Sequence, residues 1–204
     1  MLVEKSVSEL LSAFSSSDPT PGGGSASALA SAVGASLLMM VAGLPKTRTN
    51  APEERAALQD AAQTVGGLRA KLAGAIDTDT HAYDRVVTAY RLPKSSTEEQ
   101  ASRQHAIQAA LRAATDVPLD VVRWSAQALE QGAIVAQHGH RAAGSDIGVA
   151  VALLVAGGRG ALMNVETNLG SVKDAAYVEA VRGESRELAA ATERAAASVS
   201  AALS

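Results

Sequence analysis

The feature that most constrains this chain is a run of 20 residues without a charged side chain, at positions 25–44. Three glycines, Gly22–Gly24, lead directly into it, in the sequence PGGGSASALASAVGASLLMMVAGL. About 20 apolar residues can cross a bilayer as a helix, so the length alone is compatible with a membrane span. However, Ala, Ser and Gly outnumber Leu, Met and Val in this run, no aromatic belt flanks it, and no second stretch of clear hydropathy accompanies it. The sequence therefore favours a buried central helix over a membrane span.

The composition narrows the fold class and the possible partners. Aromatic residues make up only 2% of the 204 residues, so helices must pack closely through small side chains. Helical periodicity dominates and no internal repeat or linker is visible, which predicts one domain over residues 1–204. We expect an all-α, up-and-down bundle of long helices around a buried Ala/Gly-rich central helix. A net charge of −3 argues against a nucleic-acid partner.

The counts of cysteine and histidine exclude some kinds of site, and the N-terminal sequence predicts the cellular location. The chain has no cysteine, so disulfides, thiol nucleophiles and cysteine-based zinc sites are impossible. Its four histidines include one close pair, His138 and His140, without an obvious third ligand, and no metal site is predicted. The N-terminus does not have the pattern of a secretory signal, so we expect a cytoplasmic protein.

Caps and breakers predict where the helices begin and end. A capping box at Ser6–Glu9 opens the first helix, with Leu10, Leu11 and Phe14 on its inner face. A second box at Ser96–Glu99 opens a helix that Pro118 restarts or kinks. The expected helices are 7–14, 25–44, 52–90, 97–115 with its continuation to 138, 146–169, and a last one that Ser171–Asp174 caps.

A carboxylate interrupts the apolar stripe of the longest predicted helix. The stripe recurs every three or four residues with one step of seven, and comprises Leu58, Val65, Leu68, Leu72, Ile76, Asp79, Tyr83, Val86 and Tyr90. Asp77 is about 200° away around the helix and is expected to face water. A carboxylate in an apolar stripe costs several kcal/mol unless it is paired or hydrogen-bonded. Asp79 is therefore either a structural hydrogen-bond acceptor to a neighbouring helix or a residue that does chemistry.

Two other stretches combine polar groups with glycine. One stripe contains Asp146, Ala150, Leu153, Gly157, Gly160, Asn164 and Asn168. Its glycines allow another backbone or a ligand to approach closely, and Asp146 is either a helix N-cap or a site residue. The second stretch comprises Gly22, Gly23, Gly24 and Ser25, whose N–H groups at a helix start can bind an anion or carboxylate. A simple flexible turn is the alternative for that stretch.

Together these stretches resemble a family of folate enzymes. The motifs PTPGGGSASALASAVGASLLMMVAGL, DTDTHAYDRVVTAYRLPKSSTEE, ATDVPLDVV and GSDIGVAVALL…GALMNVETNL occur in the order and spacing of the cyclodeaminase/cyclohydrolase family. The resemblance covers about residues 5–180. It implies an all-helical domain that forms a homodimer and acts on the one-carbon bridge between N5 and N10 of tetrahydrofolate, with no cofactor beyond that substrate.

The resemblance also implies roles for individual residues. The family's key aspartate falls on Asp79, which would stabilise the cationic one-carbon centre and carry a proton. Asp146 would orient the substrate or its water, or hold the pterin edge. Asn164 and Asn168 would hydrogen-bond the pterin, and Tyr83 is a further substrate-binding residue. The helix start at Gly22, Gly23, Gly24 and Ser25 would fix an acidic part of the folate or close over it. Lys46 or Arg48 would meet the glutamate tail.

Two departures from the family's pattern bear on the choice of substrate. The basic segment GLPKTRTN lacks the aromatic residue that relatives carry after Arg48, and His140 follows Gly139 where asparagine is common. The expected activity is formiminotetrahydrofolate cyclodeaminase, with methenyltetrahydrofolate cyclohydrolase as the alternative at the same site. The lack of a fused transferase domain favours the cyclohydrolase or a separately supplied partner. A non-catalytic folate-binding or structural bundle is the further alternative.

Overall fold

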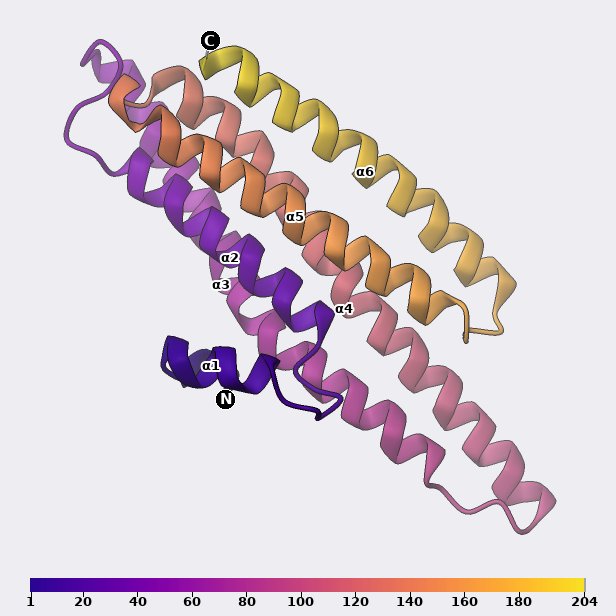
Figure 1. Cartoon of the computed structure of the whole chain (residues 1–204). Coiled ribbons are helices and arrows are strands. Elements are labelled where there is room, and N and C mark those ends of the chain that lie inside the picture. Colours follow the sequence, from indigo (N-terminus) through magenta and orange to yellow (C-terminus); the bar gives the residue numbers. More distant parts are fainter. Residues whose placement is uncertain (204) are drawn as a thin grey trace.

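The chain folds into a bundle of helices, as the sequence predicts. A computed structural model describes residues 1–203, and within that range it contains α-helices, two short 3₁₀ helices and no strand. The elements are η1 (Leu2–Glu4), α1 (Val7–Phe14), α2 (Gly23–Ala42), α3 (Pro52–Tyr90), α4 (Thr97–His138), η2 (Arg141–Ala143), α5 (Gly144–Leu169) and α6 (Ala175–Leu203). The helices α2 and α5 lie side by side, α3 and α4 form a long hairpin behind them, and α6 packs against α4 and α5 (Figure 1).

The central helix is α2, which packs against α3, α4 and α5. Its contact with α5 depends on the absence of side chains at two glycines. A Cβ atom at Gly34 would lie 2.7 Å from the carbonyl oxygen of Ala150, and one at Gly157 would lie 2.6 Å from that of Ser27. Since real Cβ atoms do not approach this closely, the two backbones can meet only because both positions are glycine. The glycines of α5 therefore admit another helix at Gly157.

Within residues 1–203, two helical segments are long and apolar enough to cross a membrane by length and composition. They are α2, with a mean hydropathy of 1.7, and the segment Arg141–Leu169, with 1.6. The second segment was not expected from the sequence. The core helix of a globular bundle meets the same criteria, and 56% of the apolar window of α2 is buried inside this bundle. The absence of a membrane partner therefore stays a prediction.

The helix α4 runs without interruption through Pro118, where the sequence predicted a restart or a kink. Proline has no backbone N–H, so the carbonyl of Ala114, four residues earlier, has no donor from that position. The side-chain amide of Asn168 on α5 donates to this oxygen at 2.8 Å. A hydrogen bond from another helix thus satisfies the carbonyl that proline leaves free.

Two predictions near the N-terminus are wrong. Leu11 is 63% exposed, so it is not on an inner face of α1, whereas Leu10 and Phe14 are half-buried. Asp77 is buried, although its position on the helix predicted a solvated charge. Its carboxylate accepts hydrogen bonds from the backbone N–H groups of Leu2 at 2.5 Å and Val3 at 3.3 Å. The N-terminal segment folds back over α3, and Asp77 holds it there.

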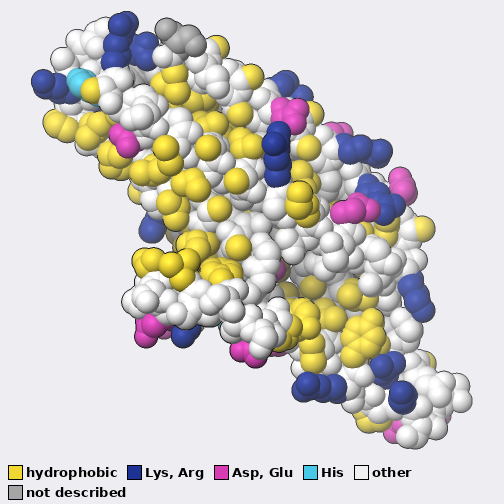
Figure 2. Space-filling model, in the orientation of Figure 1, with side chains coloured by type: hydrophobic (Ala, Val, Ile, Leu, Met, Phe, Trp, Pro, Cys, Tyr) yellow, Lys and Arg dark blue, Asp and Glu magenta, His cyan; other side chains and the backbone are white. Residues whose placement is uncertain are grey.

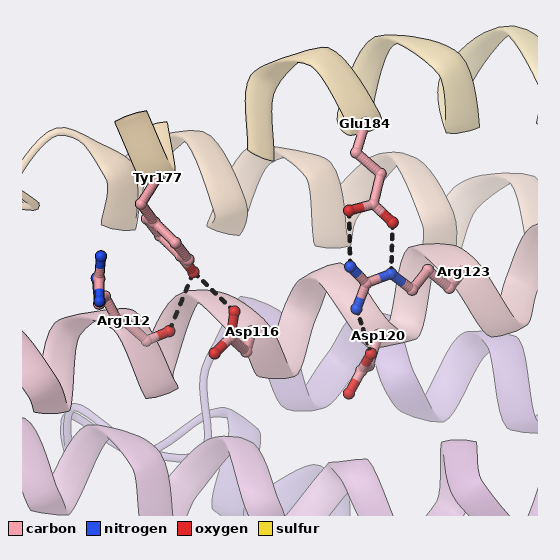
Figure 3. A network of polar contacts seen from close by, with 6 residues as sticks. All are labelled: Arg112, Asp116, Asp120, Arg123, Tyr177 and Glu184. Atoms are coloured by element: carbon pink, nitrogen blue, oxygen red, sulfur yellow. Dashed lines mark hydrogen bonds and ion pairs between the residues drawn. The ribbon is translucent and has the colours of Figure 1, made fainter. Parts of the chain in front are cut away.

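Polar contacts fix α6 against α4 (Figure 3). The guanidinium of Arg123 donates to both carboxylate oxygens of Glu184, at 2.6 and 2.7 Å, and to Asp120 at 2.7 Å. The hydroxyl of Tyr177 donates to Asp116 at 2.7 Å. The bidentate geometry sets the register of the two helices as well as their distance.

Candidate active site

A cavity of about 270 Å³ opens where α2 begins. The hairpin of α3 and α4 projects past this point, so the cavity lies on the hairpin, between the start of α2 and the end of α5 (Figure 1). Its lining comes from four helices and one loop: Pro19, Thr20, Gly22, Gly23, Gly24, Asp79, Tyr83, Val86, Leu111, Ala114, Asn164 and Asn168. None of the described residues in this lining is Lys, Arg or His.

The carboxylate of Asp79 lies directly against the first turn of α2. The hydroxyl of Ser25, which is completely buried, is 3.0 Å from Asp79 Oδ2 and 2.8 Å from the carbonyl oxygen of Ile76. A Cβ atom at Gly24 would overlap Asp79 Oδ1, so only glycine leaves room for the carboxylate. The sequence predicted an anion site at this helix start, and the anion that occupies it is the protein's own Asp79.

Burial raises the pKa of Asp79 above its ordinary value of 3.8, and hydrogen bonds from Ser25 oppose this increase. Desolvation disfavours the charged form of a carboxyl group, and the few donors around it offset that effect only in part. A carboxyl group of this kind exchanges a proton more readily near neutral pH than an ordinary aspartate does. The arrangement therefore places a titratable carboxyl group with a raised pKa at the wall of the cavity.

The two asparagines of α5 present acceptors to the cavity. Asn164 donates from its side-chain amide to the carbonyl of Gly160 at 2.8 Å, and Asn168 donates to Ala114. Among the described residues, their side-chain oxygens have no donor. Each therefore has a free acceptor for a ligand that carries N–H groups, as a pterin ring does. Tyr83, which is 42% exposed, adds an aromatic ring to the lining.

Three predicted site residues lie at the opposite end of the bundle. Asp146 is 18 positions before Asn164 on the same helix, which is about 27 Å at 1.5 Å per residue. Lys46 and Arg48 follow the far end of α2, which is about 30 Å long. One copy of the chain therefore does not place Asp146, Lys46 or Arg48 at the Asp79 cavity. Asp146 is also not the N-cap of α5, since the helix begins two residues before it, at Gly144.

The guanidinium of Arg48 makes hydrogen bonds within the bundle. Its Nη2 atom donates to the carbonyl oxygens of Ala136 at 2.8 Å and Ala202 at 3.2 Å. Both carbonyls belong to the last turns of their helices, where backbone acceptors have no intrahelical donor. Arg48 therefore caps the C-terminal ends of α4 and α6. A second cavity of about 230 Å³ beside it is lined in part by His140 and Arg141.

Sequence reasoning missed the apolar part of the lining. Val86 lies in the predicted stripe of Asp79 but was not assigned to the site, and nothing in the local sequence of Leu111 and Ala114 marks them as contacts of a ligand. Pro19 and Thr20 belong to the glycine motif but were not assigned to the site either. The dependence of Asp79 on Gly24 was likewise invisible, because the two residues are far apart in sequence and meet only after folding.

The fold and the site define a class of protein. It is an all-helical bundle in which a partly buried acid lies against the first turn of a helix, and two side-chain amides line the same cavity. The chain matches the Formiminotransferase-cyclodeaminase family over residues 6–187. It therefore belongs to that family, and it is an enzyme of the folate cyclodeaminase and cyclohydrolase group.

Individual relatives fall into both branches of the family. The chain is 40% identical over 179 residues to a methenyltetrahydrofolate cyclohydrolase of Methylorubrum extorquens, covering 88% of this chain and 86% of the relative. It is 32% identical over 181 residues to a formimidoyltransferase-cyclodeaminase of Sus scrofa, covering 89% of this chain but only 34% of that longer protein. The crystal structure of a formiminotetrahydrofolate cyclodeaminase of Thermotoga maritima matches with a TM-score of 0.88 and 25% identity, covering 100% of this chain and 98% of that one.

Proposed function

We propose that the chain is a methenyltetrahydrofolate cyclohydrolase, which opens the N5–N10 bridge of the methenyl cation with water. The observation that carries the proposal is the partly buried Asp79, whose pKa is raised, at the wall of a cavity with free amide acceptors. The 40% identity to a cyclohydrolase over most of both chains supports this reaction over the cyclodeaminase expected first from the sequence.

In the proposed reaction, the ionised Asp79 has two tasks. As a carboxylate it stabilises the cationic carbon, and it accepts a proton as water adds to that carbon. The neutral carbinolamine then receives this proton from Asp79 at N5, the bond between N5 and the carbon breaks, and the hydroxyl group becomes a carbonyl as its proton leaves to solvent. The products are 10-formyltetrahydrofolate and one proton, and Asp79 returns to its starting state.

The cavity fits the reacting end of the substrate. Its volume of about 270 Å³ is just below the range of about 300–1,000 Å³ that is typical of pockets for complete drug-sized ligands. The bicyclic pterin fits inside, where Asn164 and Asn168 accept from its N–H groups. The aminobenzoyl-glutamate part then extends out of the cavity over Tyr83.

The second candidate is the formiminotetrahydrofolate cyclodeaminase reaction at the same site. In this reaction N10 attacks the formimino carbon, the imino nitrogen gains protons, and ammonia leaves to give the methenyl cation. The similarity to the Thermotoga maritima structure over the whole chain favours it. Asp79 would again stabilise the cation and carry the proton. A cytoplasmic location and the lack of any further cofactor stay predictions.

One experiment separates these functions. Purified protein is incubated with 5,10-methenyltetrahydrofolate and, separately, with 5-formiminotetrahydrofolate, while methenyl absorbance and ammonia are measured. The proposal predicts accelerated loss of methenyl absorbance and no ammonia from the formimino compound. Ammonia release would assign the cyclodeaminase reaction instead. Folate binding without either change would identify a binding protein, and no binding would contradict both enzymatic candidates.

A further inference from the structure

The resemblance assigns Ser25 to the binding of the folate, but the structure keeps its side chain away from the cavity. Ser25 is completely buried. The glycines before it, Gly22–Gly24, line the Asp79 cavity, and Ser25 is not among the described residues of that lining. Its hydroxyl contacts the carboxylate of Asp79 and the backbone of α3 instead. Any part that Ser25 has in the reaction must therefore act through Asp79.

The hydroxyl of Ser25 has one proton and two acceptors. Its oxygen lies 2.8 Å from the carbonyl oxygen of Ile76 and 3.0 Å from Oδ2 of Asp79. A serine hydroxyl donates a single proton, so it makes one of these two hydrogen bonds at a time. The hydroxyl of Thr80, at 3.4 Å, is too far away to compete with either acceptor.

The carbonyl of Ile76 does not depend on Ser25 for its only hydrogen bond. Ile76 lies inside α3, where its carbonyl accepts from the backbone N–H four residues later, that of Thr80. Ser25 therefore adds a second hydrogen bond to an acceptor that is already satisfied. The hydroxyl can turn from Ile76 to Asp79 without leaving a buried carbonyl unpaired.

The charge of Asp79 determines which acceptor is the better one. A hydrogen bond to an ionised carboxylate is roughly twice as strong as one between neutral groups. When Asp79 is ionised, the hydroxyl of Ser25 therefore donates to Oδ2. When Asp79 binds a proton, this advantage is lost, and the nearer carbonyl of Ile76 becomes the preferred acceptor. The backbone N–H of Ser25 also bonds to Asp79, and the first turn of α2 fixes it in both states.

No charged group faces Asp79 within the described part of its surroundings. Tyr83 is the only other titratable residue of the cavity lining, and α2 has no charged residue. The carboxylate of Asp77 bonds to backbone N–H groups of the N-terminal segment, and Asp18 in the loop before α2 is exposed. Neutral residues line the cavity from α4 and α5: Leu111, Ala114, Asn164 and Asn168. Figure 2 shows mainly hydrophobic and white surface around the start of α2, with Lys and Arg side chains farther away on this face.

We propose that Ser25 is a positioning residue, whose hydroxyl alternates between Asp79 and the carbonyl of Ile76 as Asp79 loses and gains the proton of the reaction. Each charge state of Asp79 then has its own satisfied arrangement, and only one hydroxyl rotates between the two. The proton of Ser25 stays on its own oxygen, and no covalent bond changes there. The inference rests on the proposed function only for the source of the proton that Asp79 carries.

The first test is the dependence of kcat/KM on pH with the methenyl substrate. Ser25→Ala removes the rotating donor and keeps the backbone N–H, so ionised Asp79 loses one charge-assisted hydrogen bond. The acidic limb of the profile should therefore move to higher pH by about one unit, with little change in KM. Ser25→Cys, which keeps a weaker donor at the same place, should give a smaller shift.

The matched control is Ser31→Ala. Ser31 is also completely buried in α2, but its hydroxyl pairs with that of Ser125, so the limb should not move. Equal loss of rate at every pH in Ser25→Ala would show a purely structural role and contradict the proposal. A raised KM with an unmoved limb would also contradict it, because Ser25 would then bind the substrate.

The second test needs no substrate. The backbone carbonyl carbon of Ile76 is followed by NMR while the carboxyl carbon of Asp79 titrates. In the wild type the Ile76 signal should shift with the same midpoint, because its carbonyl gains a hydrogen bond when Asp79 is protonated. In Ser25→Ala the midpoint of Asp79 should rise, and the Ile76 shift should largely disappear.

Two results of this titration contradict the proposal. A steady Ile76 signal in the wild type would show that the hydroxyl does not change its acceptor. An equal Ile76 shift in Ser25→Ala would show that the field of Asp79 alone causes it. If the expected shifts appear but the wild type converts neither folate, the proposed function is refuted and the exchange at Ser25 stands.

Discussion

A buried or half-buried carboxylate of α3 lies near each end of α2, and the pKa values of the two are shifted in opposite directions. Near the far end, Glu54 accepts from the hydroxyl of Thr47 at 2.5 Å, from the N–H and hydroxyl of Thr49, and from the N–H of Ala51. These hydrogen bonds, chiefly that from Thr47, lower the pKa of Glu54 to about 2. At the near end, Ser25 is the only donor to Asp79 among the described residues, and burial raises the pKa of this carboxyl group.

The difference separates an acid that holds the fold from an acid that is available for chemistry. A carboxylate surrounded by donors is stabilised in its charged form and resists protonation. A carboxylate with few donors beside a cavity can accept and return a proton. The balance between hydrogen-bond donors, which dominate at Glu54, and burial, which dominates at Asp79, therefore indicates which acid suits a catalytic role.

The largest expected effect on the reaction rate comes from replacing Asp79, the carboxyl group with few hydrogen-bond donors. Asp79→Asn should lower kcat for the methenyl substrate by about 10²–10⁴, because the amide cannot carry the proton. Substrate binding should change little, as shown by fluorescence or calorimetric titration. Asp84→Asn, an exposed position on the same helix, is the matched control. Near-normal turnover by Asp79→Asn would remove the assigned role.

A second variant displaces the same acid without changing its chemistry. Gly24→Ala places a methyl group where Asp79 Oδ1 lies, so the carboxylate must move. A displacement on the order of 1 Å can cost about 10²-fold in rate. Steady-state kinetics should show this loss while circular dichroism shows the same helix content. Gly67→Ala on α3, where an added Cβ meets nothing within 4 Å, should have normal kinetics.

Substitution of Glu54, near the C-terminal end of α2, should change the stability of the fold rather than the rate of the reaction. Glu54→Gln should lower Tm at pH 7, since the amide cannot satisfy the donors of Thr47, Thr49 and Ala51 together. A carboxyl group whose pKa is lowered on folding stabilises the fold above its ordinary value of 4.5, and this contribution is lost as pH falls toward 2. The difference in Tm between the two proteins should therefore shrink between pH 4.5 and 2. A constant difference would show that Glu54 is not held as the charged form.

The smallest effect distinguishes the two acids by its sign. Because folding raises the pKa of Asp79, its ionisation destabilises the fold once the pH exceeds the ordinary value of 3.8. Asp79→Asn should therefore raise Tm at pH 7, and the increase should vanish below about pH 3.8, where the carboxyl group is neutral in both states. A fall in Tm at pH 7 would mean that Asp79 is a structural acceptor, the alternative that its position in the stripe left open.

The local part of the architecture was predictable from the sequence. The capping boxes at Ser6 and Ser96 occur as expected, and α3 covers the predicted residues, because caps and periodicity depend on near neighbours. Asp174, at the predicted cap of the last helix, accepts from the N–H of Tyr177. The position of Asp79 at the cavity follows from the same periodicity.

The remaining features depend on contacts between distant segments. Asp77 is buried because residues 2 and 3 return to cover it, and its own helix gives no sign of that. The continuity of α4 through Pro118 depends on Asn168, which is 50 positions further on. The separation of Asp146 from Asp79 follows from the antiparallel packing of α2 and α5. Two motifs of one family pattern therefore need not lie close together in one folded chain.

The central claim is that the chain leaves Asp79 short of donors while it satisfies Glu54. The most direct measurement is a site-resolved titration of both carboxyl carbons by NMR, assigned with Asp79→Asn and Glu54→Gln. The account predicts that Glu54 titrates near pH 2 and Asp79 above 3.8. A titration of Asp79 below 3.8, in the manner of Glu54, would contradict it.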